Sequence, residues 1–337
     1  MHQPVRQPGR RGDAPTSALP PVCLLGGSGF VGSRLAAALA TRGYPVVVPT
    51  RQRSRARHLL VLPTVRLLET DVGQPAALEA ALRGSRVVVN LVGILNERGR
   101  DGAGFRQAHS QFAAAVVAAS AHLGIHKLVQ VSALGADADA GPSHYLRSKG
   151  AAERAISHAT SPAWTILQPS LIFGAGDSST NRFGRLLGRL PWVFPLAMPQ
   201  ARFAPVHVDD VVAAIVRAIE EPGTNGRTYQ LCGPEVLSLI DIVRRIVAAL
   251  GLQRRVIGLP RWASRLQARV MDFVPGKPFS TDNFLSLTVD SVCSENGFAA
   301  LGIEPRAFDA NLSAALDDLL SPGRLGILRR AAGRSGR

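Results

Sequence analysis

The chain of 337 residues lacks any uninterrupted apolar run near the roughly 20 residues that a membrane-spanning helix needs, so we expect no segment to cross a bilayer. Residues 1–20 lack the apolar core of a secretion signal and contain four prolines, which predicts a disordered tail, with a transit peptide as the alternative. Cysteine is scarce: Cys23, Cys232 and Cys293 are odd in number, far apart and without a C-x-x-C pair. We therefore expect no disulfide framework, no metal site and a reducing compartment.

Lysine is also rare, since it occurs only at positions 127, 149 and 277, and arginine supplies the other basic residues behind a formal net charge of +15. We interpret this bias as a coding preference and expect no nucleic-acid partner. Two stretches, 244–269 and 324–337, carry arginines and no acid. We expect a solvated face and a basic tail there, with attraction to an anionic partner or a membrane surface as the alternative.

A glycine-rich turn stands near the start of the chain. The apolar stretch 22–25 leads into three glycines at three-residue spacing, and an Ala/Leu-rich stretch follows. The residues of the turn are Gly26, Gly29, Phe30, Val31 and Gly32. Glycines let the backbone approach a pyrophosphate, and the N–H groups and dipole at the start of a helix favour that anion. We therefore expect a dinucleotide site, against the alternative of a strand-to-helix turn with no ligand.

Short apolar runs and helical stretches alternate after this turn. We expect strands at 45–51, 65–72, 87–93 and 127–132, and helices at 75–83, 105–123 and 145–158. The run 87–93 is almost wholly apolar, which is typical of a parallel strand buried on both faces. The sequence therefore predicts the α/β class, with a Rossmann-type doubly wound parallel sheet and ample apolar residues, 46%, for its core.

The end of the second expected strand indicates which dinucleotide binds. An acid at this position holds the 2′-hydroxyl of NAD, whereas an arginine suits the 2′-phosphate of NADP. This chain has Arg51, then three more arginines and no acid. We therefore favour NADP(H) over NAD(H), with a basic surface loop as the alternative. Asp71, at the end of the third expected strand, is placed to meet the adenine amino group.

Three further residues indicate chemistry. Ser132 ends the fifth expected strand, and Tyr145 and Lys149 lie four residues apart, on one face of the following helix. A nearby ammonium lowers the pKa of a phenol, so we expect Lys149 to activate Tyr145 as the proton carrier while Ser132 holds a substrate carbonyl and the nicotinamide passes hydride. The alternative is that Tyr145 only caps or packs the helix and Lys149 is exposed.

These motifs together resemble the extended and atypical short-chain dehydrogenase/reductases. They are the glycine turn, Arg51, the Ser132, Tyr145 and Lys149 set, and the stretches 166–174 and 205–210. A narrower set resembles the branch that contains the NADPH-holding accessory subunit of respiratory complex I and its bacterial relatives. It comprises 90–97, 131–136, 173–177, 181–183 and 279–283. The likeness runs from about residue 21 to about residue 318.

The resemblance implies a role for each matching position. Gly26, Gly29 and Gly32 would bind the pyrophosphate, Arg51 the 2′-phosphate, Asp71 and Val72 the adenine, Val92 and Gly93 the middle of the cofactor, Tyr145 and Lys149 the nicotinamide ribose, and Pro169 the region of the nicotinamide ring. Two positions depart from the family pattern. His109 stands about where related enzymes often have an asparagine, which puts a proton relay in doubt. Gln168 replaces a common arginine and puts a substrate or structural contact in doubt.

The resemblance also implies a smaller lobe over the nicotinamide end. We expect the Rossmann domain at 21–170 with 206–220 returning to it, the smaller lobe at 171–205 and 221–320, and a basic tail at 321–337. Residues 186–199 are very apolar for a loop. We expect them to pack as a lid on the smaller lobe, with the lining of a pocket for an apolar substrate, or docking on a membrane, as the alternatives.

The expected helix 261–273 combines two stripes. Trp262, Leu266, Val270 and Phe273 share one stripe, and three arginines share another. We expect the apolar stripe to face the core and the arginines to face water, with attachment to anionic lipid as the alternative.

Three functions remain open at this stage. The first is an NADPH-dependent carbonyl or alcohol oxidoreductase with a small apolar substrate, such as a quinone-like compound. The second is a non-catalytic NADPH-holding subunit or assembly factor of respiratory or quinone-making machinery. The third is a nucleotide-sugar epimerase or dehydratase, against which we weigh the apolar stretch 186–199. We expect a cytoplasmic protein, with peripheral attachment to the inner face of the membrane or to a respiratory complex as a further expectation.

Overall fold

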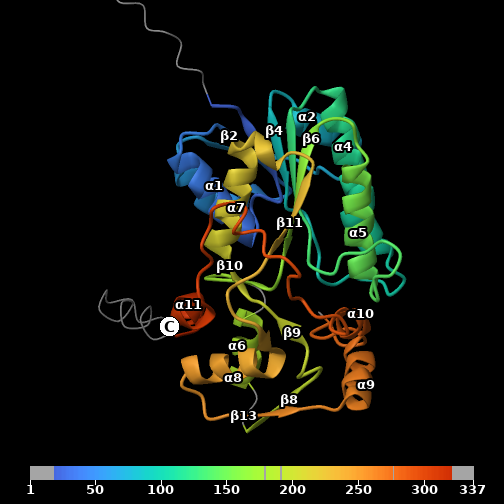
Figure 1. Cartoon of the computed structure of the whole chain (residues 1–337), viewed down its shortest axis with the longest axis vertical. Helices are drawn as coiled ribbons and strands as arrows, with labels where there is room; N and C mark the ends of the chain where they lie inside the picture. The colour runs from blue at the N-terminus through green and yellow to red at the C-terminus, as the bar shows by residue number, and fades with distance from the viewer. Residues whose placement is uncertain (1–18, 178–179, 190–191, 276, 321–337) are drawn as a thin grey trace, which may run out of the picture.

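Seven parallel strands form the main sheet of the computed structural model, which describes residues 19–177, 180–189, 192–275 and 277–320 (Figure 1). In spatial order the strands are β11 (Arg227–Leu231), β6 (Ala163–Pro169), β5 (Lys127–Val131), β4 (Val87–Asn90), β1 (Val22–Leu25), β2 (Val46–Thr50) and β3 (Val65–Glu69). The strand order reverses between β1 and β4, which is the switch point of a doubly wound sheet. The predicted fold class is confirmed.

Helices cover both faces of this sheet. One face carries α1 (Phe30–Thr41) and α7 (Val208–Glu220), and the other carries α2 (Pro75–Leu82), α4 (Phe112–His122) and α5 (His144–Ser157) (Figure 1). Strand β1 contributes side chains to the cores on both faces of the sheet, because successive side chains of a strand point to opposite faces. Val22 and Leu24 pack under α1 and α7, and Cys23 and Leu25 pack under α2 and α4. Burial on both faces explains why β1 and β4 are apolar.

The helix expected at 105–123 is not continuous. It consists of α3 (Ala103–Arg106), a π-helical turn η2 (Gln107–Gln111) and α4. Short 3₁₀ turns η1 (Arg53–Val61) and η3 (Pro222–Thr224) follow β2 and α7. The π-helical turn contains His109, and single π turns inside α-helices are frequent at functional sites.

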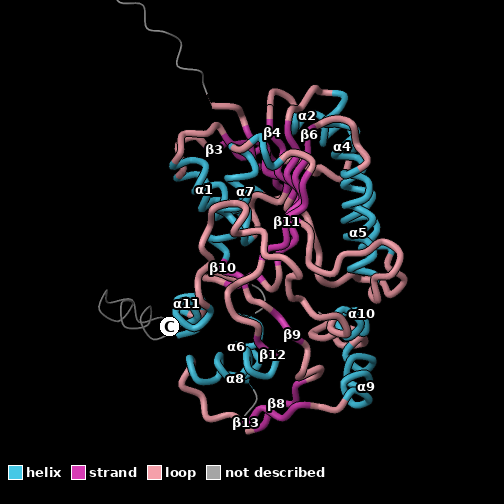
Figure 2. The backbone as a smooth tube through the Cα atoms, in the orientation of Figure 1, coloured by secondary structure: helices cyan, strands magenta, loops and turns pink. Residues whose placement is uncertain are grey.

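The smaller lobe is built from helices and short strand pairs (Figure 2). The pairs are β7 (Ile172–Phe173) with β10 (Val206–His207), β8 (Val193–Leu196) with β13 (Arg255–Gly258), and β9 (Arg202–Phe203) with β12 (Leu237–Ser238). The helices are α6 (Thr180–Arg189), α8 (Leu239–Ala249), α9 (Arg261–Met271), α10 (Thr281–Ser286), α11 (Phe308–Ala315) and α12 (Asp317–Leu320). The buried face of α8 supplies much of this lobe's core, through Ile242, Val243 and Ile246.

The expected domain ranges need one correction. Strand β11, placed in the smaller lobe by the range 221–320, is the seventh strand of the main sheet. Phe298 and Leu301 also pack into the core of that sheet. We propose that the Rossmann unit includes these segments as well as 206–220, and that the smaller lobe keeps the intervening residues. The expected tails at 1–18 and 321–337 lie outside the described residues.

The stretch 186–199 is not an extended loop. Its first residues end α6, and residues 193–196 form β8, which pairs with β13. Leu187, Phe194 and Leu196 are buried in the core of the smaller lobe, whereas Trp192 is exposed. The expectation that this stretch packs on the smaller lobe therefore holds for its buried residues.

The arginines of helix α9 face water as expected, but the expectation that its apolar stripe faces the core is wrong. Its buried residues are the small Ser264 and Ala268, and the apolar stripe lies in solvent. A core-facing stripe and a surface stripe have the same sequence period, so the period does not reveal which neighbour the helix meets. Within the described ranges, no helix has the length and apolar character needed to cross a bilayer.

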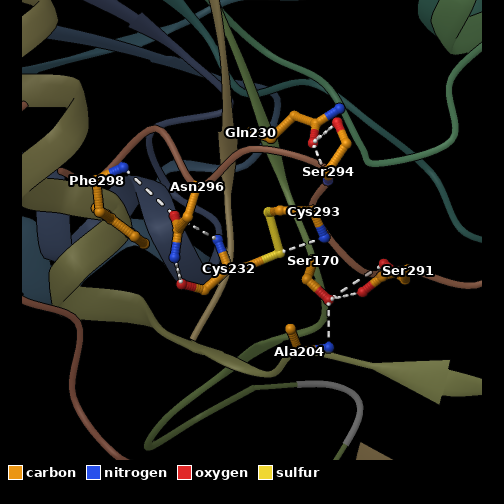
Figure 3. The surroundings of a disulfide bond; sticks show 9 residues. All are labelled: Ser170, Ala204, Gln230, Cys232, Ser291, Cys293, Ser294, Asn296 and Phe298. Atoms are coloured by element: carbon orange, nitrogen blue, oxygen red, sulfur yellow. Dashed lines mark hydrogen bonds between the residues drawn. A yellow bond between two sulfur atoms is a disulfide. The ribbon is translucent and has the colours of Figure 1, made fainter. Parts of the chain in front are cut away.

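The expectation of no disulfide is also wrong. Cys232, after β11, is bonded to Cys293 in the segment that follows α10, across 61 residues of sequence (Figure 3). Hydrogen bonds also connect the two segments: Asn296 donates to the backbone oxygen of Cys232, and the Gln230 side chain accepts from Ser294. Folding brings these two cysteines together although their spacing in the sequence gave no sign of contact. The expectation of a reducing compartment rested on the absence of a disulfide, so it loses its support.

Candidate active site

The glycine turn has the shape that a dinucleotide phosphate needs. Gly26 has a φ of +81°, and a Cβ there would lie 3.1 Å from the backbone of Leu91. A Cβ on Gly32 would lie 2.5 Å from the oxygen of Gly26, so only glycine lets α1 start this close to the turn. The N-cap is Gly29, with no side-chain cap and no acid in the first turn of α1. The N–H groups and the positive end of α1 are therefore left for an anion, and the turn fits a pyrophosphate.

The adenosine end of the expected site lies where β2 and β3 end. Arg51 follows β2 and is exposed. The turn η1, with its arginines, is held near the start of α1 by a 3.0 Å hydrogen bond between His58 Nε2 and Ser33 Oγ, which sequence reasoning missed. The carboxylate of Asp71 accepts from the N–H of Gly73 at 3.1 Å and so shapes the loop after β3. Val72 packs partly on the core beneath it.

The middle of the expected site is formed by the end of β4. The side chain of Asn90 accepts from the N–H of Val92 at 3.1 Å and donates to Gln130 at 2.8 Å, which ties β4 to β5. A Cβ on Gly93 would lie 3.3 Å from Lys149 Nζ. Gly93 therefore lets the chain pass directly over the lysine, and the two expected cofactor contacts at 93 and 149 come together.

A cavity of about 300 Å³ lies between the carboxyl edge of the main sheet and the smaller lobe. Four of the predicted site residues line it: Phe30, Ser132, Tyr145 and Pro169. Most of the other lining side chains are apolar, among them Leu95, Leu134, Leu171, Leu287 and Val289. None of the described residues of 186–199 lines this cavity. The cavity wall is therefore apolar, but the apolar residues come from other segments than 186–199, the stretch considered for this role from the sequence.

Ser132 is buried at the wall of this cavity. Its Oγ makes no hydrogen bond of ordinary geometry within the described residues. Burial raises the pKa of the nearby Glu153 carboxyl, and the Ser132 hydroxyl offsets part of that rise. A buried hydroxyl without a well-formed partner is costly in a folded protein. The arrangement fits a donor kept for a ligand oxygen.

Tyr145 is fixed at the start of α5 by the smaller lobe. Ser143 caps the helix, and the carboxylate of Asp282 in α10 accepts from the N–H groups of His144 at 2.7 Å and Tyr145 at 3.2 Å. Burial, together with this carboxylate, raises the pKa of Tyr145 to about 12. The pKa of Tyr145 is therefore raised in this structure and not lowered as we expected from Lys149; burial is the larger cause and Asp282 the smaller one.

Lys149 is buried and points under the end of β5, where its Nζ donates to the backbone oxygen of Val131 at 3.2 Å. Burial lowers the pKa of Lys149 to about 8. The structural alternative is thus wrong for Lys149, which is not exposed, and for the cap, which is Ser143; Tyr145 does pack, against the ring of His109.

His109 stands behind these residues in a fixed tautomer. Its Nε2 accepts from the N–H of Ile94 at 3.0 Å, so Nδ1 carries the proton that it donates to Ser148 Oγ at 2.7 Å. Ser148 in turn donates to the backbone oxygen of Tyr145. The rings of His109 and Tyr145 meet edge to face, with centroids 5.5 Å apart. Burial and the Lys149 charge lower the pKa of His109 to about 3, so the ring is a neutral support.

Gln168 has a structural contact. Its amide nitrogen lies 2.9 and 2.8 Å from the two carboxylate oxygens of Glu153, which joins β6 to α5. Sequence reasoning missed this partner, and it missed Asp282 and Ser148. The only available signal for Asp282 was the motif 279–283, which marked the family branch without giving the residue a role.

Comparison with known proteins agrees with this geometry. The model of the NAD(P)H-binding family matches residues 26–222, more than half of the chain. The chain belongs to this family. Mitochondrial NADH dehydrogenase (ubiquinone) 1 alpha subcomplex subunit 9 from Arabidopsis thaliana is 31% identical over 288 residues, which cover 81% of this chain and 71% of that protein. Within the short-chain dehydrogenase/reductases, the chain falls in the branch that contains this complex I accessory subunit.

Other relatives are enzymes. The ceramide reductase of Caulobacter vibrioides is 30% identical over 250 residues, covering 73% of this chain and 75% of that enzyme. Among solved structures, UDP-glucuronic acid 4-epimerase from Bacillus cereus, in complex with UDP-glucuronic acid and NAD, aligns with a TM-score of 0.68 at 18% identity, over 88% of this chain and 98% of that one. At that identity the likeness concerns the fold alone.

Proposed function

We propose that this chain is an NADP(H)-dependent oxidoreductase that reduces the carbonyl group of an apolar substrate, with Tyr145 as the proton donor. The observation that carries the proposal is the cavity in which Ser132, Tyr145 and Pro169 meet beside Phe30 of the glycine turn. A nucleotide whose pyrophosphate lies on the start of α1 would run along the edge of the sheet, past Gly93, toward this cavity.

The residues of the chain divide the work. When bound, the nicotinamide supplies the hydride that reaches the carbonyl carbon. Ser132 Oγ holds the carbonyl oxygen, and the Tyr145 hydroxyl delivers the proton that this oxygen gains. A phenol with a pKa of about 12 stays protonated near neutrality and is therefore ready as a donor. Lys149 holds the ribose hydroxyls, and His109 with Asp282 keeps Tyr145 in position.

The substrate class follows from the cavity wall. Apolar side chains, many of them leucines, form most of the lining beyond Ser132 and Tyr145, which suits a ketone or quinone with a hydrocarbon body better than a sugar diphosphate. The relation to a ceramide reductase supports a reductase of apolar compounds.

The test uses the purified protein with NADPH and a panel of quinones and long-chain ketones, followed by loss of NADPH absorbance. Tyr145→Phe should lower kcat by about 10²–10⁴-fold while NADPH still raises the melting temperature. The control is Val236→Ser, an exposed residue that does not line the cavity. Equal oxidation by wild type and Tyr145→Phe contradicts the proposed role of the tyrosine.

The preference for NADP(H) over NAD(H) is part of the same proposal, and it rests on Arg51 at the end of β2. Arg51→Asp should weaken NADPH binding by about tenfold or more, because a charge-assisted contact to phosphate is lost, and it should leave NADH binding nearly unchanged. Equal losses for both nucleotides contradict the assignment of the 2′-phosphate to Arg51.

A second candidate is a non-catalytic NADPH-holding subunit or assembly factor of respiratory or quinone-making machinery, positioned at the cytoplasmic, inner face of a membrane. The 31% identity to a complex I subunit favours it. It predicts NADPH that copurifies with the protein, that no acceptor oxidises, and that stabilises wild type and Tyr145→Phe equally.

A further inference from the structure

Helix α9 presents its apolar stripe to solvent. Trp262 is 72% exposed and Phe273, two residues after the helix, is 76% exposed, and Leu266 and Val270 between them are also exposed. Figure 1 shows α9 at the outer edge of the smaller lobe, beside α10. Single exposed apolar residues are ordinary, but four of them at helical spacing, two of them large aromatics, form a patch that marks an interaction site.

A stripe of arginines runs beside this apolar stripe. Arg261, Arg265 and Arg269 follow the spacing of one helical turn and are exposed. Within the described part of the chain, none of these three forms an ion pair. The one nearby acid at the end of the helix, Asp272, is turned inward and accepts from the N–H and the hydroxyl of Thr281. The exposed half of α9 is thus basic along one stripe and apolar along the next.

The patch continues to the rim of the cavity. The Arg100 guanidinium lies 4.0 Å above the Phe273 ring, and the Lys277 ammonium donates to the backbone oxygens of Arg98 and Gly99. These contacts join the end of α9 to the loop after β4. The same loop contains Leu95, an exposed residue that lines the cavity. The basic residues that border the patch are Arg98, Arg100 and Lys277.

We propose that α9 docks on the surface of an anionic lipid bilayer, with its apolar stripe among the acyl chains and its arginines on the headgroups. The argument is charge complementarity: a stripe of unpaired arginines meets a negative headgroup layer, and the adjoining Trp, Leu, Val and Phe side chains suit the boundary beneath it. A nucleic acid could stack bases on the two aromatic rings, but it offers no apolar layer for Leu266 and Val270 between them. Because the patch reaches Leu95, docking brings the cavity rim to the membrane, where an apolar substrate resides.

The experiment is flotation of the full chain with vesicles of phosphatidylcholine alone or mixed with phosphatidylglycerol. Wild type should float with the mixed vesicles, and high salt should reduce the bound fraction. The triple variant Arg261→Gln, Arg265→Gln and Arg269→Gln should lower the partition coefficient by about tenfold or more. The charge-matched control changes Arg66, Arg83 and Arg227, exposed residues of the Rossmann unit, to glutamine and should bind as wild type does.

The apolar stripe is tested in the same way. Trp262→Ser with Phe273→Ser should lose binding, whereas Leu60→Ser with Val61→Ser, an exposed apolar pair on η1, should retain it. In a background with Trp164→Phe and Trp192→Phe, which leaves Trp262 as the one tryptophan of the chain, lipids brominated on the acyl chain should quench its fluorescence. All variants are compared by melting temperature, so that a folding defect is recognised.

Three outcomes overturn the proposal. They are no flotation of a folded wild type, equal losses in the α9 variant and its charge-matched control, and flotation without quenching of Trp262. NADPH oxidation in detergent is independent of α9, so failure of docking and failure of the proposed reductase are separate results.

Discussion

The two sides of the cavity differ in how they are built. On the side of the main sheet, Ser132 and Lys149 are buried, and each lies at the end of a strand or on a helix tied to the sheet by hydrogen bonds. On the side of the smaller lobe, Leu287 and Val289 are partly or largely exposed and follow a short helix. In the proposed reaction the sheet side carries the groups that hold or move protons, and the lobe side carries apolar surface.

This difference indicates a division of labour. Proton transfer requires groups fixed to a fraction of an ångström, which buried and hydrogen-bonded residues provide. Recognition of an apolar body tolerates a softer wall. Asp282 links the two sides, because it lies in the lobe and holds the first turn of the helix that carries Tyr145. Four predictions sharpen the contrast.

The largest effect is expected inside the smaller lobe, where two helices of 11 residues have opposite surroundings. Ile246 of α8 is fully buried and Leu266 of α9 is exposed. Ile246→Ala should lower the free energy of unfolding by about 2–5 kcal/mol, because it leaves a cavity, and Leu266→Ala should change it by less than about 0.5 kcal/mol. Denaturant titration measures both, and similar losses would show that α9 packs its stripe after all.

The second prediction compares two serines that end neighbouring strands and line the same cavity. Ser132 lacks a well-formed partner, whereas Ser170 donates to the oxygen of Ser291 and accepts from the N–H of Ala204 (Figure 3). Ser132→Ala should lower kcat by about 10²-fold and leave the melting temperature within about 1 °C. Ser170→Ala should instead lower the free energy of unfolding by about 1–3 kcal/mol. A large stability loss in Ser132→Ala would make that serine structural.

The third prediction concerns two valines of similar exposure. Val289 lines the cavity and Val236 does not. Val289→Ser should raise KM for an apolar ketone by about threefold to tenfold with kcat nearly unchanged, because methyl groups in contact with the substrate are lost. Val236→Ser should leave KM as it is. Steady-state kinetics of the two variants measure this difference. An equal KM for both would contradict contact between the substrate and the lobe side of the cavity.

The smallest effect is a pH dependence that comes from the sheet side. The pKa of Lys149 is lowered to about 8, so its charge is complete below that pH and is lost as pH rises through it. The pKa values of His109, about 3, and Tyr145, about 12, lie outside the usual assay range. We expect kcat/KM for ketone reduction to fall by about half near pH 8 and further above it. Lys149→Arg, whose charge does not titrate, should flatten the profile; an unchanged profile in that variant assigns the titration elsewhere.

Most of the correct predictions rested on patterns among residues close together in the sequence. The glycine turn and the parallel sheet depend on residues close together in the chain, and they were predicted from spacing and apolar runs. The cluster of Ser132, Tyr145 and Pro169 was also predictable, because the carboxyl ends of parallel strands meet at one edge of the sheet.

The misses all depend on contacts between distant segments. The pKa of Tyr145 is set by burial and by Asp282, which lies 137 residues away. The bond between Cys232 and Cys293 joins segments 61 residues apart. The exposure of α9 depends on whether another element covers it, and a hydrophobic stripe has the same period in either case. Strand β11 joined the main sheet by the same kind of distant pairing.

The measurement that tests the central claim most directly is hydride transfer itself. The protein is incubated with an apolar ketone and NADPH that carries deuterium on the transferable position of the nicotinamide, and the product alcohol is examined by mass spectrometry. Wild type should place deuterium on the former carbonyl carbon, and Tyr145→Phe should place almost none there under the same conditions. NADPH that remains fully deuterated with every ketone and quinone, while bound to a folded protein, would contradict the account and favour a nucleotide held for structure.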